Sequence, residues 1–308
     1  MLYPMPDFPL VSIITVNYNG LIHTEAFLKS LQKITYPNIE IFVVDNASPQ
    51  GIGSLKSDFP YINLIESKEN LGFAGGNNLA IREAKGKYFF LINNDTELDA
   101  HFLEPVVALM ESNSHIGLAS SKLVYFNQPD LLQYAGSTGI NMYTGRGFAI
   151  GHHERDSSKF DAEYKTELAH GAAMMISRAV IENIGLLADL YFLYYEETDF
   201  CERVKRAGFE IWYCGLSKVY HKESMSVGKE SPMKTYYLTR NRLIFTRRNT
   251  SGFQKAGAIL FFYLLSFPKG IVKYLVKKEF KLLHSFISGA LWNLFHYNIY
   301  HNSGLIIK

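Results

Sequence analysis

The sequence predicts an α/β fold with a doubly wound, mostly parallel sheet, followed by a C-terminal helical extension. Two observations lead to this prediction. Between residues 11 and 221, short apolar runs typical of buried strands alternate with segments in which apolar residues recur at helical spacing. Beyond residue 230, apolar helical segments and lysines dominate. We therefore divide the chain into an α/β domain, residues 1–230, and a helical, basic and apolar extension, residues 231–308.

The first part of the α/β domain is predicted to form successive β-α-β units. Crossovers of this kind join parallel strands in a right-handed sense. The run of five apolar residues at 88–92 stops abruptly at Asn93-Asn94-Asp95, as a buried strand ending in polar chemistry would. The expected elements are strands at 11–16, 39–44, 62–65 and 88–92 and helices through 27–34 and 74–84.

The second part of the domain gives weaker signals. Asp99 is expected to cap a helix that runs to about Ser112, and a strand is expected at 118–124. The stretch from Asn127 to Thr166 lacks a clear period and is expected to be an irregular loop, suited to a substrate lid. The later elements expected are an apolar strand within 170–178, an aromatic strand at 191–195, a helix that opens at Glu196, and a strand from 210 that leads to His221.

Polar residues follow three of these strands at the point where each ends. Asn17, Asp45 and Asp95 should collect along one edge of the sheet, because parallel strands end on the same side. Polar loops after strands are also ordinary, but three of them together favour a binding site. A carboxylate such as Asp95 is a hard oxygen ligand, which suits a divalent cation that carries phosphate.

Two further stretches have residues suited to chemistry. The loop Asn70–Asn78 has three glycines in five positions and opens a helix, so its backbone can approach an anionic ligand, although it is neither a Walker loop nor a dinucleotide fingerprint. Glu196, Glu197 and Asp199 occupy the first turn of a predicted helix. The helix dipole alone favours acids there. A carboxylate in that place can also accept a proton from a hydroxyl group.

Composition excludes several classes of protein. A chain of 308 residues with 47% hydrophobic and 19% charged residues can bury a large core. Cys201 and Cys214 are too few for a disulfide framework or a zinc cluster, which fits a reducing compartment. Residues 255–308 hold seven lysines and one glutamate, a charge of +6, so a net charge of +2 leaves −4 for the rest. An acidic main body argues against a nucleic-acid-binding protein.

The composition of the extension predicts that it contacts a membrane surface. The N-terminus lacks the charged and apolar regions of a signal peptide, so a cytoplasmic location is expected. No apolar run is expected to reach the ~20 residues of a spanning helix. Residues 256–267 are apolar all round before Pro268-Lys269-Gly270 interrupts, a composition that suits an interfacial helix at the inner face of the cell membrane. Packing on the protein core or on a second subunit is the alternative.

Six ordered motifs resemble those of the family 2 inverting glycosyltransferases with the GT-A fold, especially the bacterial rhamnosyltransferase-like group. The resemblance spans about residues 10–249. It implies a nucleotide-sugar donor such as a UDP- or dTDP-sugar, rhamnose among the sugars, and Mg²⁺ or Mn²⁺ as cofactor. It also implies inverting transfer to a hydroxyl of a glycan or lipid-linked glycan. The matching motifs are 11–20, 44–48, 70–78, 91–96, 170–172 and 195–203.

The resemblance also implies roles for single residues. Asp95 is the main metal carboxylate, because Asn93 stands at the first position of the family's Asp-x-Asp motif, and His221 resembles a metal-binding histidine. Glu197 stands where the family usually has aspartate and resembles the catalytic base, with Asp199 as the second candidate. The positions that resemble nucleotide-sugar-binding residues are Asn17, Tyr18, Asp45, Gly72, Gly75, Asn77, Asn94, His170 and Gly171.

Two other functions remain open at this point. A sugar-phosphate nucleotidyltransferase shares a nucleotide-binding α/β sheet, but it generally has a basic glycine-rich loop close to the first strand, and Asn17-Tyr18-Asn19-Gly20 is not one. A non-catalytic glycan-binding module could have kept the fold. The acids at 95, 197 and 199 argue against that alternative.

Overall fold

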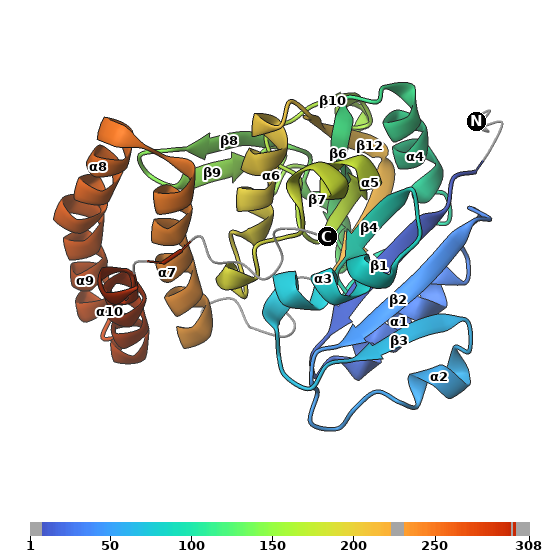
Figure 1. Cartoon of the computed structure of the whole chain (residues 1–308), viewed down its shortest axis with the longest axis horizontal. Helices are drawn as coiled ribbons and strands as arrows, with labels where there is room; N and C mark the ends of the chain where they lie inside the picture. Colours follow the sequence, from blue (N-terminus) through green and yellow to red (C-terminus); the bar gives the residue numbers. More distant parts are fainter. Residues whose placement is uncertain (1–7, 223–230, 297, 300–308) are drawn as a thin grey trace.

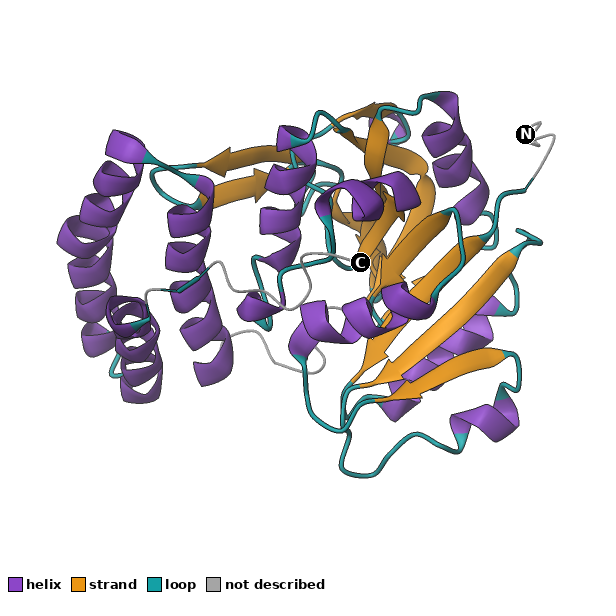
Figure 2. Cartoon of the chain, in the orientation of Figure 1, coloured by secondary structure: helices purple, strands orange, loops and turns teal. Residues whose placement is uncertain are grey.

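A mixed sheet forms the centre of the computed structural model, which describes residues 8–222, 231–296 and 298–299 (Figure 2). Within these residues the sheet has ten strands, and a separate hairpin pairs β8 (Ser137–Asn141) with β9 (Arg146–Ala149). The strands of the large sheet are β1 Val11–Asn17, β2 Ile39–Asp45, β3 Ile62–Glu66, β4 Tyr88–Ile92, β5 Thr96–Leu98, β6 Ile116–Tyr125, β7 Gln128–Tyr134, β10 Glu163–Lys165, β11 Ala173–Ser177 and β12 Glu210–His221.

The strand order is β10-β12-β6-β11-β4-β1-β2-β3, with β5 beside β12 and β7 beside β6. The half of the sheet made by β4, β1, β2 and β3 is parallel throughout, as the β-α-β pattern predicts. β11 runs antiparallel between β4 and β6, while β6 and β12 are parallel to each other. β1, β2 and β4 therefore all end at the same edge.

Helices cover both faces of the sheet (Figure 1). Neighbouring residues of β1 point to opposite faces, so Ile13 packs in one core cluster and Ile14 in the other. This arrangement confirms the doubly wound α/β class. The first face carries α1 (Leu21–Leu31), α2 (Leu55–Asp58) and α4 (Leu103–Ser112), and the second carries α3 (Gly72–Glu83), α5 (Arg178–Ile184) and α6 (Glu196–Arg206).

Three local expectations are wrong. The stretch 127–166 is not irregular, because it contains four short strands: β7 pairs with β6, β8 pairs with β9, and β10 pairs with β12. Residues 191–195 are not a strand, since a short 3₁₀ turn (Asp189–Tyr191) leads into residues with positive φ. Asp99 does not cap α4, which begins at Leu103; its side chain accepts from the N–H of His101 instead.

The extension consists of helices that stand beside the α/β domain (Figure 1). The domain boundary expected at residue 230 lies outside the described residues. α7 lies between α6 and the outer helices, and α10 packs along it. These helices are α7 Pro232–Asn249, α8 Gly252–Phe261, α9 Phe267–Val276 and α10 Phe280–Phe295.

The apolar segment of the extension is longer than expected. A π-helical turn, Phe262–Ser266, joins α8 to α9, so Gly252–Val276 is one helix of 25 residues. Pro268 does not interrupt it. Proline has no N–H to donate, and Pro268 stands at the start of α9, directly after the π-helical turn, where the regular helical hydrogen bond is not needed. By length and composition this helix could cross a membrane, and 6% of its most apolar window is buried. Contrary to the expectation, the helix as a whole is therefore long and apolar enough to span, although its stretch without charge, 256–268, has 13 residues.

Candidate active site

A buried network of side chains joins the carboxyl ends of β1, β2 and β4. Asn17 Nδ2 donates to Asp45 Oδ1 at 2.9 Å and to Ser48 Oγ at 3.0 Å. Asn17 Oδ1 accepts from Thr24 Oγ1 at 2.9 Å and from Asn94 Nδ2 at 3.3 Å. The polar strand ends therefore meet at one edge of the sheet.

Asn17 is closed to ligands, because it is 0% exposed and both of its polar atoms are in use. Asp45 is also buried, and it accepts from the side chain and the backbone of Ser48. Tyr18, the next residue along the chain, is 43% exposed. Of the two residues expected beside the nucleobase, Tyr18 is thus the one with a side chain open to a ligand, while Asn17 fixes the loop around it.

Asp95 and His221 meet where β4 and β12 end. Asp95 Oδ1 lies 3.2 Å from His221 Nε2, and both side chains are buried. Gln133 Oε1 lies 2.7 Å from His221 Nδ1, and because an amide oxygen can only accept, Nδ1 carries a proton. Burial acts to raise the pKa of Asp95, but the hydrogen bond and the charge of His221 outweigh it, so the pKa lies below its ordinary value.

The Asp95–His221 pair fits a divalent cation. Asp95 Oδ1 and His221 Nε2 face each other, and the amide of Asn93 also lies 3.4 Å from Nε2, so a carboxylate oxygen and a ring nitrogen are directed to one place. Carboxylate oxygen and imidazole nitrogen suit Mn²⁺ or Mg²⁺, and an amide behind the histidine orients the ring as second-shell groups do. The 3.2 Å between Asp95 Oδ1 and His221 Nε2 is close to the spacing of about 3 Å that two neighbouring ligands of such a cation would have. No group of three or more His, Cys, Asp or Glu side chains in the described residues could hold a metal, so Asp95 and His221 are a pair and not part of a larger cluster of these residues.

The glycines before and inside α3 are explained by protein packing. A Cβ on Gly72 would lie 2.0 Å from the carbonyl oxygen of Phe192, and one on Gly75 would lie 2.6 Å from a side chain of the preceding turn. The N–H of Phe73 donates to that same carbonyl at 2.7 Å, and Asn77 Nδ2 donates to the carbonyl of Phe73. Gly72 and Phe73 therefore dock α3 on the loop before α6, whereas Gly75 and Asn77 pack within the first turns of α3. Close approach of their backbone to an anion stays a prediction from the sequence.

The segment His170–Ala172 lies between the end of β4 and the start of α6. The N–H of Asn93 donates to the carbonyl of Ala172 at 3.1 Å. A Cβ on Gly171 would lie 3.7 Å from Cβ and Cγ of Glu197. This segment is therefore hydrogen-bonded just after β4, two residues before Asp95, and its Gly171 lies beside Glu197.

His170 is a neutral histidine. Its Nδ1 accepts from the N–H of Ala172 at 3.1 Å, which leaves the proton on Nε2. Burial, and then the charges of His221 and His152, lower the pKa of His170 to about 3. At neutral pH its ring can therefore donate a hydrogen bond but carries no charge.

The loop before α6 holds three aromatic residues in left-handed conformations. Phe192, Tyr194 and Tyr195 have φ of 66°, 69° and 75°. Such a conformation costs a non-glycine residue about 1–3 kcal/mol and persists only where the surroundings enforce it. We call residues 190–195 the base loop, because it leads directly into Glu196 and Glu197.

Two glutamates open α6. Glu196 is buried, and burial followed by the charge of Glu197 raises its pKa well above the ordinary value. Glu197 is half-buried, and burial raises its pKa too, although backbone hydrogen bonds from Glu197 and Thr198 oppose this. In the described part of the chain, no ion pair holds Glu197, so its carboxylate can take part in proton transfer.

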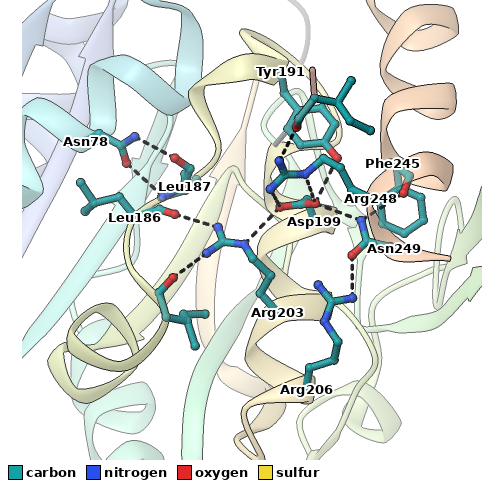
Figure 3. Close-up of polar contacts among 12 residues, drawn as sticks. Asn78, Leu186, Leu187, Tyr191, Asp199, Arg203, Arg206, Phe245, Arg248 and Asn249 are labelled. Atoms are coloured by element: carbon teal, nitrogen blue, oxygen red, sulfur yellow. Dashed lines mark hydrogen bonds and ion pairs between the residues drawn. The ribbon is translucent and has the colours of Figure 1, made fainter. Parts of the chain in front are cut away.

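Asp199 has the opposite surroundings (Figure 3). Its carboxylate accepts from Arg203 Nε at 3.1 Å, Arg248 Nε at 3.0 Å, Asn249 Nδ2 at 2.9 Å and the hydroxyl of Tyr191 at 3.1 Å. Burial acts to raise its pKa, but Arg248 and Arg203 outweigh it, so the pKa is lowered. Asp199 is 0% exposed, and its carboxylate is fully hydrogen-bonded. For Asp199, the second candidate base, this favours a structural role over a catalytic one.

Several residues that shape this site were missed by sequence reasoning. Arg203 could have been found, because it stands four residues after Asp199 on one helix face. Gln133, Asn241 and Arg248 gave no local signal, since their partners lie 47 to 88 residues away.

Known proteins resemble this chain in sequence and in fold. The model of the family described as "Glycosyl transferase family 2" matches residues 12–185, more than half of the chain. A low-salt glycan biosynthesis hexosyltransferase, Agl10, of Haloferax volcanii is 28% identical over 91% of this chain and 90% of its own length. The N-acetylglucosaminyl-diphospho-decaprenol L-rhamnosyltransferase of Mycobacterium tuberculosis is 21% identical over 80% of this chain and 87% of its own length.

A solved structure shows the same fold. The mannosyltransferase PcManGT from Pyrobaculum calidifontis, in complex with GDP-Man and Mn²⁺, superimposes with a TM-score of 0.58 over 94% of this chain and 88% of its own, at 15% identity. The family match decides against a nucleotidyltransferase and a non-catalytic module. The chain belongs to glycosyl transferase family 2, and it is a glycosyltransferase with the GT-A fold.

Proposed function

We propose that this enzyme transfers a sugar from a nucleoside-diphosphate donor to a hydroxyl group with inversion at the anomeric carbon. The acceptor hydroxyl attacks that carbon while the bond to the diphosphate breaks, and Glu197 takes the hydroxyl proton. One base and no covalent nucleophile give inversion. The observation that carries the proposal is the position of His170–Ala172, which lies beside Glu197 at Gly171 and is hydrogen-bonded to the end of β4 at Ala172.

Asp95 and His221 are proposed to bind the divalent cation. Bound there, Mg²⁺ or Mn²⁺ would stabilise the charge that develops on the leaving diphosphate. Tyr18, exposed at the strand edge, is proposed to lie against the nucleobase. Asp45, Asn94 and the neutral His170 border the same edge and are proposed to contact or position the donor, while Asn17 acts through Asp45. We propose UDP- or dTDP-sugars, including dTDP-rhamnose, as donors.

A thermal-shift screen tests this proposal. UDP-, dTDP- and GDP-sugars are added with Mn²⁺, with Mg²⁺ or with EDTA. A donor at 100 times its Kd stabilises the fold by about 2.7 kcal/mol, so the cognate donor should raise the Tm by several degrees with metal and much less with EDTA. Asp95→Ala should keep the Tm of the free enzyme and lose the metal-dependent part. Equal shifts with EDTA would refute the metal site, and no shift from any donor would refute the donor class.

The acceptor is proposed to be lipid-linked, since the helix Gly252–Val276 presents large apolar side chains to solvent. Lysines flank them, so the surface suits anionic lipid. The stretch without charge, 256–268, is only 13 residues or roughly 20 Å long, short of the ~30 Å hydrocarbon core. We therefore propose that the helix lies in the cytoplasmic face of the membrane rather than across it. Its exposed residues include Phe253, Leu260, Leu264, Leu265, Val272 and Val276.

Liposome flotation checks the membrane proposal. The full chain should float with vesicles that contain anionic lipid and be released by alkaline carbonate. Leu264→Glu with Leu265→Glu should abolish flotation, whereas Ile22→Glu, a change at an apolar side chain that is 74% exposed on α1, should not. Resistance to carbonate would mean that the helix spans the membrane. No flotation of the intact protein would refute the proposal.

A further inference from the structure

The base loop is held by α7, a helix of the extension. Asn241, on α7, is 0% exposed, and its Nδ2 lies 2.9, 2.8 and 2.8 Å from the carbonyl oxygens of Tyr191, Leu193 and Tyr194. An amide has two N–H groups, so one of them is shared between two carbonyls. Asn241 Oδ1 in turn accepts from Arg240 Nε at 2.8 Å.

Every carbonyl of the base loop from 190 to 194 has a protein partner. Arg240 donates to the carbonyls of Leu190 at 2.6 Å and Tyr191 at 3.0 Å. The carbonyl of Phe192 accepts from α3, as described above, and the ring of Phe192 stacks on Tyr237 of α7 at 5.0 Å. No glycine occurs between 186 and 200, so the left-handed conformations of the loop depend on these contacts.

Glu197 lies between two attachments to α7. Asn241 holds the chain three to six residues before Glu197, and Arg248 and Asn249 hold Asp199 two residues after it. The amide of Asn241 is buried and fully engaged, so it cannot touch a substrate. We propose that Asn241 is a positioning residue for the reaction: by fixing the base loop, it places the carboxylate of Glu197 against the acceptor hydroxyl. This inference rests on the proposed role of Glu197 as the base.

A double-mutant cycle tests it. Asn241→Ser fits the site and removes the contacts with three carbonyls. The probe is slow hydrolysis of the nucleotide sugar that stabilises the wild type most, with water in place of the acceptor. We expect kcat to fall at least tenfold with the KM for the donor within twofold. In a Glu197→Gln background the same change should lower kcat less than twofold, because a residue that acts through the base has no effect once the base is gone.

Hydrogen exchange gives a second readout that needs no substrate. Asn241→Ser should speed exchange of the amides at 190–198 and leave β1 and β4 unchanged. Arg247→Ala is the matched control: Arg247 is on α7 too, but it donates to Asn293 and to the carbonyl of His296 at the α10 side. The control should loosen α7 from α10 while kcat stays within twofold. If Asn241→Ser does not fold, Arg240→Lys, which withdraws the forked contacts to the loop, replaces it in the cycle.

The outcomes separate this inference from the proposed function. If Glu197→Gln is as active as the wild type, the base assignment fails. If Glu197→Gln is inactive but Asn241→Ser keeps wild-type kcat, or lowers kcat equally in both backgrounds, Asn241 is a structural residue only and the inference is wrong.

Discussion

The two sides of the first turns of α6 have opposite electrostatic surroundings. Glu197 lies on the side that faces Gly171, without an ion pair in the described residues, and its pKa is raised. Asp199, two residues later and about 200° around the helix, faces α7 with two arginines, and its pKa is lowered. Neighbouring carboxylates whose pKa values are pushed apart usually have different tasks.

The difference shows how one helix can serve catalysis and stability together. A base needs a carboxylate that can gain and lose a proton near working pH, so it must not be locked by cations. A carboxylate that joins two elements needs those cations, since a buried charge without partners is costly. The following changes would break or sharpen this contrast.

The largest expected effect is on turnover. Glu197→Gln should cut kcat by ~10²-fold or more, the size of losing a general base, and keep donor affinity. Single-turnover kinetics with donor affinity from the thermal-shift titration would measure both. Normal turnover in this variant together with loss of turnover in Asp199→Asn would reverse the assignment.

The next effect is on stability. Asp199→Asn removes the negative charge that pairs with Arg203 and Arg248, and breaking a buried pair by removing one partner costs about 3–5 kcal/mol. Urea unfolding at pH 7 would measure the loss of free energy of unfolding. A change below about 1 kcal/mol would show that the arginines find other partners and that Asp199 is not the joint between α6 and α7.

The pH dependence of that loss has a definite sign. The folded pKa of Asp199 is depressed below its unfolded value of 3.8, so its contribution is present above that pH and is lost as pH falls toward the folded pKa. The stability gap between wild type and Asp199→Asn should therefore narrow on going from pH 5 to pH 3. A gap that widens on acidification would contradict a lowered pKa.

Activity should respond to pH through Glu197. Because burial raises the pKa of Glu197 above 4.5 and the base must be unprotonated, kcat/KM should fall about tenfold per pH unit below that raised pKa. The residual activity of Glu197→Gln should lack this acid limb. An unchanged limb in the variant would assign the titration to another group.

The smallest effect should come from keeping the charge at the joint. Arg248→Lys retains a cation beside Asp199 but loses the forked geometry, and we expect a loss of about 1 kcal/mol in the free energy of unfolding and a change in kcat below threefold. Thermal unfolding and the hydrolysis assay would measure these. A loss as large as that of Asp199→Asn would mean that geometry matters more than charge at this joint.

Local patterns in the sequence determined the parallel half of the sheet and the start of α6. Buried strands such as 88–92 and helical spacing in 74–84 are signals carried by neighbouring residues, and the structure has β4 and α3 there. Because parallel strands end on one side, the meeting of Asn17 with Asp45 followed from the same patterns. The acids at the start of α6 were also found from the sequence, as candidates without an order between them.

Only the tertiary structure decided how those candidates differ. The cations of Asp199 come from Arg203 on the same helix and from Arg248, 49 residues away, and no local spacing encodes the second contact. The left-handed base loop depends in the same way on Asn241, 47 to 50 residues away, so an aromatic run that favours a strand by propensity becomes a turn. Long-range hydrogen bonds and burial set these conformations and pKa values, and both arise only when distant segments pack together.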